Sequence, residues 1–154
     1  MIAQDCRHRS LRSPAMWHPW RTLRGMPDVT VHLRRDLPVG VRAATDGQQI
    51  LMSSRLLQRE RRAALAHELE HIRHCRVVDC THRDEVFIRQ AAARRLIDIE
   101  QLAKALVWTQ DVDELAEELW VDVDTVRTRL EHLHPAERLH LRRRLAERDG
   151  EDTG

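Results

Sequence analysis

The chain has 154 residues, of which 42% are apolar and 33% are charged, and its formal net charge is +1. This length suits one domain, the composition excludes a disordered chain, and the near-zero net charge gives no general attraction to nucleic acid or acidic membranes. No apolar run approaches the roughly 18 residues that a membrane-spanning helix needs. No apolar stretch follows the basic N-terminus, as it would in a secretory signal, so we expect a cytoplasmic protein.

The first part of the chain predicts a small sheet. Residues 1–15 are basic and almost without apolar side chains, which predicts a flexible tail ahead of a short helix at 18–24. Three segments have strand-like patterns: 29–33, 41–45 and 49–52. Asp46-Gly47 between the last two predicts a type I′ hairpin with positive φ at both residues. We therefore expect a small, largely antiparallel sheet.

From Leu56 onward, apolar periodicity predicts helices at 56–75, 84–97, 99–108, 112–119, 123–132 and 135–148. Asp84, Asp98, Asp111 and Asp122 stand where N-caps belong. Because there is no internal repeat and no long linker, the fold prediction is one α+β domain over 16–148. Its C-terminal helical part spans about 111–148, and 149–154 are predicted to be a disordered tail.

Residues 67–71 read His-Glu-Leu-Glu-His, which is the His-Glu-x-x-His pattern. Residues four apart share one face of a helix, so His67 and His71 can each offer an imidazole nitrogen to one Zn²⁺ at about 2.0–2.1 Å. Glu68 lies about 100° around the helix, where it stays unligated and can accept a proton from an attacking water molecule. The pattern predicts His67 and His71 as zinc ligands and Glu68 as the catalytic base. The alternative interpretation is a solvated helix face in a chain rich in arginine and histidine.

A catalytic zinc ion needs a third protein ligand. Glu85 heads an apolar stripe along the inward face of the helix predicted at 84–97, and a carboxylate in that position needs a cation. Asp84 points about 100° away and is better placed as an N-cap. Asp79 and His82 are the alternative ligands in the connecting loop. The other interpretation of Glu85 is an exposed acid in the first helical turn, where the helix dipole favours it.

The odd number of cysteines, Cys6, Cys75 and Cys80, lacks the spacing of a disulfide framework and predicts free thiols. Cys75 and Cys80 have His74 and His82 as neighbours, which leaves a second metal site as the alternative. Their separation differs from that of a Cys-x-x-Cys zinc knuckle.

With these residues, the chain resembles the ImmA/IrrE family of metallo-endopeptidases, particularly its compact actinobacterial and phage forms. The similarity runs from Trp17-His18-Pro19-Trp20 through the zinc pattern to the basic segment at 130–145. It implies a zincin-like fold with Zn²⁺ bound by His67, His71 and Glu85, and with Glu68 as general base. It also implies a protein substrate, namely a helix-turn-helix repressor of a phage or mobile element.

One position departs from the resembled family. The family often has a polar residue that supports a metal ligand in the helix after the glutamate ligand. In this chain Arg89 takes its place. The chain also contains no tyrosine. The donor that stabilises the oxyanion of peptide hydrolysis must therefore be a histidine, an arginine, a backbone N–H, or absent. His74 is the nearest candidate along the sequence, and a surface histidine is the alternative interpretation of it.

Residues 111–133 have the pattern of a helix-turn-helix, so a DNA-binding regulator is an alternative function. This segment holds eight acidic residues and two arginines, a net charge of −6. Phosphate contacts need Lys and Arg, so we predict that the segment packs within the peptidase and does not contact nucleic acid. A third possibility is a sensing or binding protein with a peptidase-like fold and no hydrolysis.

Overall fold

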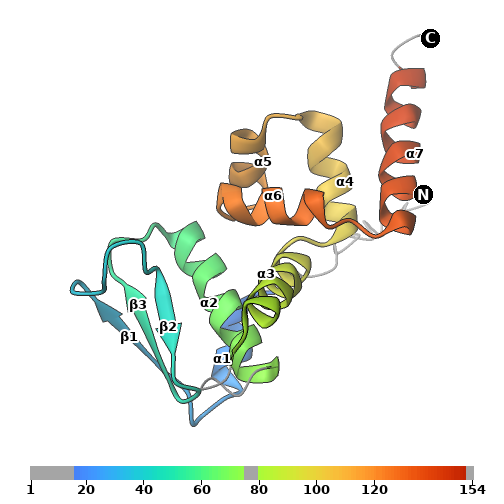
Figure 1. The fold of residues 1–154 in the computed structure, drawn as a ribbon. Coiled ribbons are helices and arrows are strands. Elements are labelled where there is room, and N and C mark those ends of the chain that lie inside the picture. Colours follow the sequence, from blue (N-terminus) through green and yellow to red (C-terminus); the bar gives the residue numbers. More distant parts are fainter. Residues whose placement is uncertain (1–15, 75–79, 152–154) are drawn as a thin grey trace, which may run out of the picture.

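Figure 1 shows the computed structural model, which describes residues 16–74 and 80–151. In chain order the elements are α1 (Pro19–Arg24), β1 (Thr30–Arg34), β2 (Ala43–Thr45), β3 (Gln49–Ser53), α2 (Gln58–His74), α3 (His82–Leu96), α4 (Ile99–Trp108), α5 (Val112–Glu118), α6 (Val123–Glu131) and α7 (Pro135–Glu151). A small sheet followed by helices confirms the predicted α+β class. Outside the described residues lie the predicted tail at 1–15, the thiols of Cys6 and Cys75, and the alternative ligand Asp79.

The sheet is mixed, with β3 between β1 and β2. β2 runs antiparallel to β3, with Ala44 opposite Leu51, whereas β1 runs parallel to it, with Val31 opposite Ile50. The prediction of a largely antiparallel sheet is therefore wrong for β1. The hairpin places β2 on one side of β3, and residues 35–42 carry the chain across from β1 on the other side. A strand pattern marks extended backbone and leaves the direction of its partner open.

The β2–β3 hairpin is confirmed, but its turn type differs from the prediction. Gly47 has a φ of +100°, whereas Asp46 is not among the described residues with positive φ. The carboxylate of Asp46 accepts hydrogen bonds from the backbone N–H of Gln48 (2.9 Å) and Gln49 (2.6 Å). Asp46 N–H also donates to the Gln49 carbonyl (3.2 Å). The two central residues are thus Gly47 and Gln48, and glycine alone takes the left-handed conformation.

Side-chain caps set the helix starts. Asp98, Asp111 and Asp122 are N-caps, as predicted. Asp84 is not: Thr81 caps α3, and Asp84 sits three residues later in a reciprocal capping box. Two more residues can therefore join the helix ahead of Asp84, which the prediction missed because Thr81-x-x-Asp84 lacks the usual Glu or Gln. At the other end, α7 continues to Glu151, beyond the predicted end at 148.

The helix α2 lies between two apolar clusters. Leu65 and Leu69 pack with Ile50 and Met52 of β3, all fully buried. Ala63 and Ala66 of α2 belong to the larger cluster of α3 to α7. Figure 1 shows α2 with the sheet on one side and α3 on the other, and α4 to α7 grouped beyond α3. No helix within 16–74 and 80–151 combines the length and the apolar character needed to cross a bilayer.

Arg62 of α2 ties these parts together from a fully buried position. Its guanidinium donates to four carbonyls: Leu119 (3.2 Å), Trp120 (2.8 Å), Trp17 (3.2 Å) and Leu96 (3.3 Å). Leu96 is the last residue of α3 and Leu119 is the C-cap of α5, and unpaired carbonyls at helix ends carry partial negative charge that favours a cation. Burial lowers the pKa of Arg62 to about 10, so the side chain stays charged at neutral pH.

Candidate metal centre

α2 presents both predicted histidine ligands on one face. The Nε2 atoms of His67 and His71 are 3.1 Å apart, and the two rings meet edge to face at a centroid distance of 4.8 Å. Leu65 and Leu69 fix the same helix against the sheet. Because these leucines occupy the sheet side of α2, the two histidines lie on another face, which is turned toward α3.

Glu85, in the first turn of α3, completes the group. Its Oε1 atom lies 3.2 Å from His67 Nε2, and its Oε2 atom lies 3.1 Å from His71 Nε2. The capping box of Thr81 sets where α3 begins, and it thereby sets which residue of the first turn reaches α2. The three predicted ligands come together, and Glu85, whose side chain is 34% accessible, points toward the two histidines from the first turn of α3.

The spacing of these ligand atoms fits a zinc ion. A tetrahedral ion with bonds of about 2.0–2.1 Å keeps its ligand atoms roughly 3.3 Å apart. The two Nε2 atoms are 3.1 Å apart, each lies 3.1–3.2 Å from a different oxygen of Glu85, and one ligand atom from each residue lies within 4.8 Å of the others. Two histidines and one glutamate are a donor set that zinc uses in catalytic sites, with a fourth position left open. Within the described part of the chain, this is the one group of three or more His, Cys, Asp or Glu side chains close enough to share an ion.

A second contact orients His71. The Nδ1 atom of His71 lies 3.3 Å from Cys80 Sγ, just before α3. When Nδ1–H donates to the sulfur, the lone pair of Nε2 is the one directed at Glu85 and at the metal position. Cys80 is therefore part of the support of the site. Because Cys75 lies outside the described residues, the alternative of a second metal site with Cys80 stays untested.

The electrostatic surroundings keep His67 neutral. Burial lowers its pKa below the ordinary histidine value, Glu85 opposes this, and the electrostatic effects of neighbouring His71, Arg89 and Arg42 lower the pKa further. Neutral imidazole is the form that binds a metal ion. The histidine is thus in its ligand form at neutral pH.

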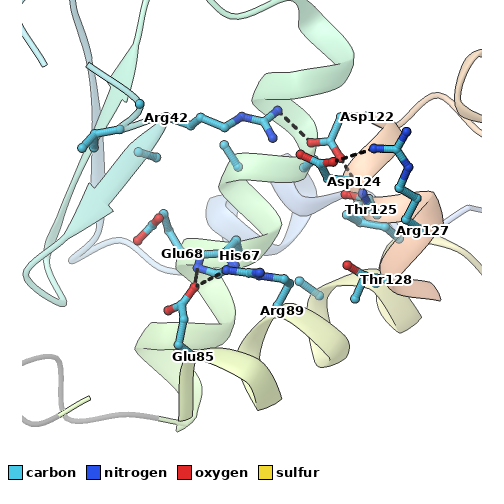
Figure 2. Close-up of a pocket in the computed structure, with 18 of the residues that line it drawn as sticks. Arg42, His67, Glu68, Glu85, Arg89, Asp122, Asp124, Thr125, Arg127 and Thr128 are labelled. Carbon is cyan, nitrogen blue, oxygen red and sulfur yellow. Dashed lines mark hydrogen bonds and ion pairs between the residues drawn. The ribbon is translucent and has the colours of Figure 1, made fainter. Parts of the chain in front are cut away.

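Glu68 lies next to the ligands without belonging to them. Only 6% of the residue is exposed, and Figure 2 shows its carboxylate beside His67, with Glu85 reaching the same region from α3. Burial raises the pKa of Glu68 to about 7, and the negative charge of Glu85 acts in the same direction. A carboxyl group with a pKa near neutrality can both take up and return a proton, as a general base requires.

The remaining candidates lie elsewhere. His74 Nε2 is 3.1 Å from Glu70 Oε2, and its ring packs edge-on against Phe87, so it does not line the site. His82 is exposed at the start of α3 and stands outside the ligand group. Arg89, one turn after Glu85, lies beside the ligands, with Nη2 3.5 Å from Glu85 Oε1.

The centre opens into a cleft of about 600 Å³. Its walls are residues 40–43 leading into β2, the site face of α2, the facing side of α3, and α6 with its N-cap. Across the cleft, Arg42 Nη2 lies 2.7 Å from Asp122 Oδ2, as Figure 2 shows. Asp122 also caps α6, because its Oδ1 accepts from Thr125 N–H at 2.7 Å. The walls of the cleft therefore come from segments that are far apart in the sequence.

The contribution of α6 to the cleft is the part that sequence reasoning missed. Asp122 is predicted as an N-cap and is one, but nothing near it in the chain indicates that Arg42 is its second partner. Asp124, Thr125 and Thr128 line the same wall. The predicted helix-turn-helix segment does pack within the protein, since Leu115, Val121 and Val126 are fully buried.

Comparisons of the chain with protein-family models, with curated proteins and with solved structures give no match.

Proposed function

We propose that this chain is a zinc-dependent endopeptidase with a zincin-like arrangement of sheet, metal helix and supporting helix. The observation that supports it most is the convergence of His67, His71 and Glu85, whose ligand atoms lie within 4.8 Å of one another next to the buried carboxyl of Glu68. Zinc bound there would polarise a peptide carbonyl and make the attacking water more acidic.

The residues of the chain have distinct roles in this proposal. His67, His71 and Glu85 would hold the ion, three being the number of protein ligands that a catalytic zinc uses. Glu68 takes a proton from the attacking water and returns it to the amide nitrogen as the C–N bond breaks. Its raised pKa, which burial causes, favours this exchange near neutral pH.

The cleft favours an extended peptide. β2 is an edge strand of the sheet, and residues 40–43 at its start line the cleft. An edge strand offers unpaired backbone N–H and C=O groups to which a substrate segment can pair as an added strand. The neighbouring wall of α2 contributes Ala63 and Ala64, which leave room for substrate side chains.

By its resemblance to the ImmA/IrrE family, the proposed substrate is a helix-turn-helix repressor of a phage or mobile element. A cytoplasmic location follows from that substrate, since such repressors act on cytoplasmic DNA. Direct binding of nucleic acid by this chain is not favoured, because the α5–α6 segment carries a net charge of −6 and would repel phosphates. An inert sensing protein with the same metal centre remains the alternative.

The Glu68→Gln variant tests the proposal. We expect wild-type protein to hold about one zinc per chain after dialysis and to cleave a repressor encoded nearby when the two are co-expressed. Glu68→Gln should keep the zinc and lose hydrolysis by at least about a hundredfold, whereas His67→Ala should lose both. Glu118→Gln, at an exposed residue of α5, is the matched control and should behave as wild type.

The outcomes separate the candidates. Zinc uptake without cleavage of any nearby repressor supports the inert sensing protein. Absence of zinc uptake would falsify the metal centre itself. Full activity of Glu68→Gln contradicts the assignment of the base.

A further inference from the structure

The cleft contains a positively charged side chain, Arg89, that is neither a proposed metal ligand nor the proposed base. Arg89 lies one helical turn after Glu85 on α3 and lines the cleft together with His67 and Glu68. Its side chain is 62% exposed, and its Nη2 atom lies 3.5 Å from Glu85 Oε1. Figure 2 shows the guanidinium directed along the cleft toward the metal ligands.

The other arginines of the cleft wall lie away from the metal ligands, and so does the nearby His74. Arg42 is held by Asp122 at 2.7 Å. Arg127 lies on α6, beside Asp124 and across the cleft from His67 and Glu85, as Figure 2 shows. His74 is turned away toward Glu70. Among the described residues that line the cleft, Arg89 is therefore the cation next to the metal ligands.

A metal ion bound to Glu85 would weaken the contact between Arg89 and Glu85. At 3.5 Å the two groups are beyond good hydrogen-bond distance, so the attraction is mainly one of charge. When Glu85 shares its negative charge with a metal ion, less of it remains to hold the guanidinium. An arginine keeps its own charge at any working pH, and it then favours a new anion formed nearby.

We infer that Arg89 donates a hydrogen bond to the oxyanion that forms on the scissile carbonyl; this rests on the proposed peptidase function. Water attacks the carbonyl carbon, Glu68 takes the water proton, and the carbonyl electron pair moves onto oxygen, next to Arg89. As the pair returns, the C–N bond breaks and Glu68 passes its proton to the departing amine. The other product is a carboxylic acid, which then loses its remaining proton to the solvent. A donor aimed at such an oxyanion accelerates reactions by about 10²–10³-fold, and the chain has no tyrosine for this task.

Binding of a tetrahedral anion tests the assignment without a known substrate. The protein is loaded with Co²⁺, whose visible spectrum reports its coordination, and is titrated with methylphosphonate. Arg89→Met should weaken methylphosphonate binding by about tenfold to a hundredfold, the loss expected for one charge-assisted hydrogen bond. The Co²⁺ affinity should change by less than about threefold. Arg89→Lys should recover part of the loss, and Arg127→Met, on the opposite wall, should bind as wild type does.

Several results would overturn the assignment. Unchanged methylphosphonate binding in Arg89→Met removes the proposed donor. Equal losses in Arg89→Met and Arg127→Met show a general effect of cleft charge. Equal losses of Co²⁺ and of the anion show that Arg89 only positions Glu85. A wild-type protein that takes up no metal refutes the proposed function and this inference with it. If a repressor is cleaved, Arg89→Met should lower kcat by about a hundredfold with little change in KM.

Discussion

The Nε2 atom of His71 lies 3.1 Å from Oε2 of Glu85, although the two residues belong to different helices. Without a cation between them, a neutral imidazole and a carboxylate at this distance share at most one hydrogen bond. The same holds for His67 and Glu85, at 3.2 Å. Three lone-pair donors held together by two packed helices are prepared for a metal ion before it arrives.

Removal of the third ligand should weaken zinc binding strongly. We expect Glu85→Ala to reduce zinc affinity by more than about a hundredfold, since loss of a supporting residue alone costs 10–100-fold. Competition with a coloured chelator measures the affinity. Arg83→Ala, at an exposed residue of the same helical turn, is the control, and its zinc affinity should stay close to that of wild type. Equal zinc affinity in Glu85→Ala and wild type would exclude Glu85 as a ligand.

The free energy of unfolding of the metal-free protein should depend on pH through the titration of Glu68. Burial raises the pKa of Glu68 to about 7, from 4.5 as the ordinary value. The folded state thus binds the proton more tightly, so the stability from this group is present below pH 4.5 and is lost as pH rises through about 7. Glutamine does not ionise, so the Glu68→Gln variant avoids this loss. Above pH 7 its free energy of unfolding should exceed that of wild type by on the order of 3 kcal/mol.

Urea unfolding of both metal-free proteins, at pH values on either side of this window, measures the difference. The subtraction removes the titration of other groups, such as His67, that both proteins share. A difference between the two proteins that does not vary with pH contradicts the raised pKa. The zinc-loaded proteins should show a smaller dependence, because a nearby cation favours the carboxylate form of Glu68.

Acid should release the zinc. Both histidines must be neutral to bind, and burial lowers the pKa of His67 below its ordinary value. Protons therefore compete for the ligands only below about pH 6.5, the usual histidine pKa. We expect half of the zinc to be lost below about pH 6, as measured by metal analysis after dialysis. Metal content that stays constant down to about pH 4.5 would show that the ligands do not titrate as histidines do.

Arg62 should be among the most sensitive structural positions. Replacement by methionine keeps much of the volume but leaves the carbonyls of Trp17, Leu96, Leu119 and Trp120 without this donor. We expect a loss of about 3–5 kcal/mol in the free energy of unfolding, as for other broken buried polar networks. Arg83→Met, at an exposed residue of α3, should change it by less than about 0.5 kcal/mol. Similar unfolding midpoints for the two variants would contradict the linking role of Arg62.

Much of this protein can be derived from local patterns. Apolar residues every three to four positions predict α2 to α7, and Asp98, Asp111 and Asp122 mark helix starts because a side chain that caps a helix acts within its own turn. The pair His67 and His71 is equally local, since helix geometry alone brings residues four apart together.

Contacts between distant segments were decided by tertiary structure. The parallel pairing of β1 with β3 and the approach of Arg42 to Asp122 depend on how packed elements meet, which no local pattern encodes. The same packing places Glu85 at the histidines and brings Arg89 alongside. Sequence by itself thus determined the helices and the chemistry of the ligand residues, whereas burial of the apolar faces of α2 and α3 decided which side chains share one cleft.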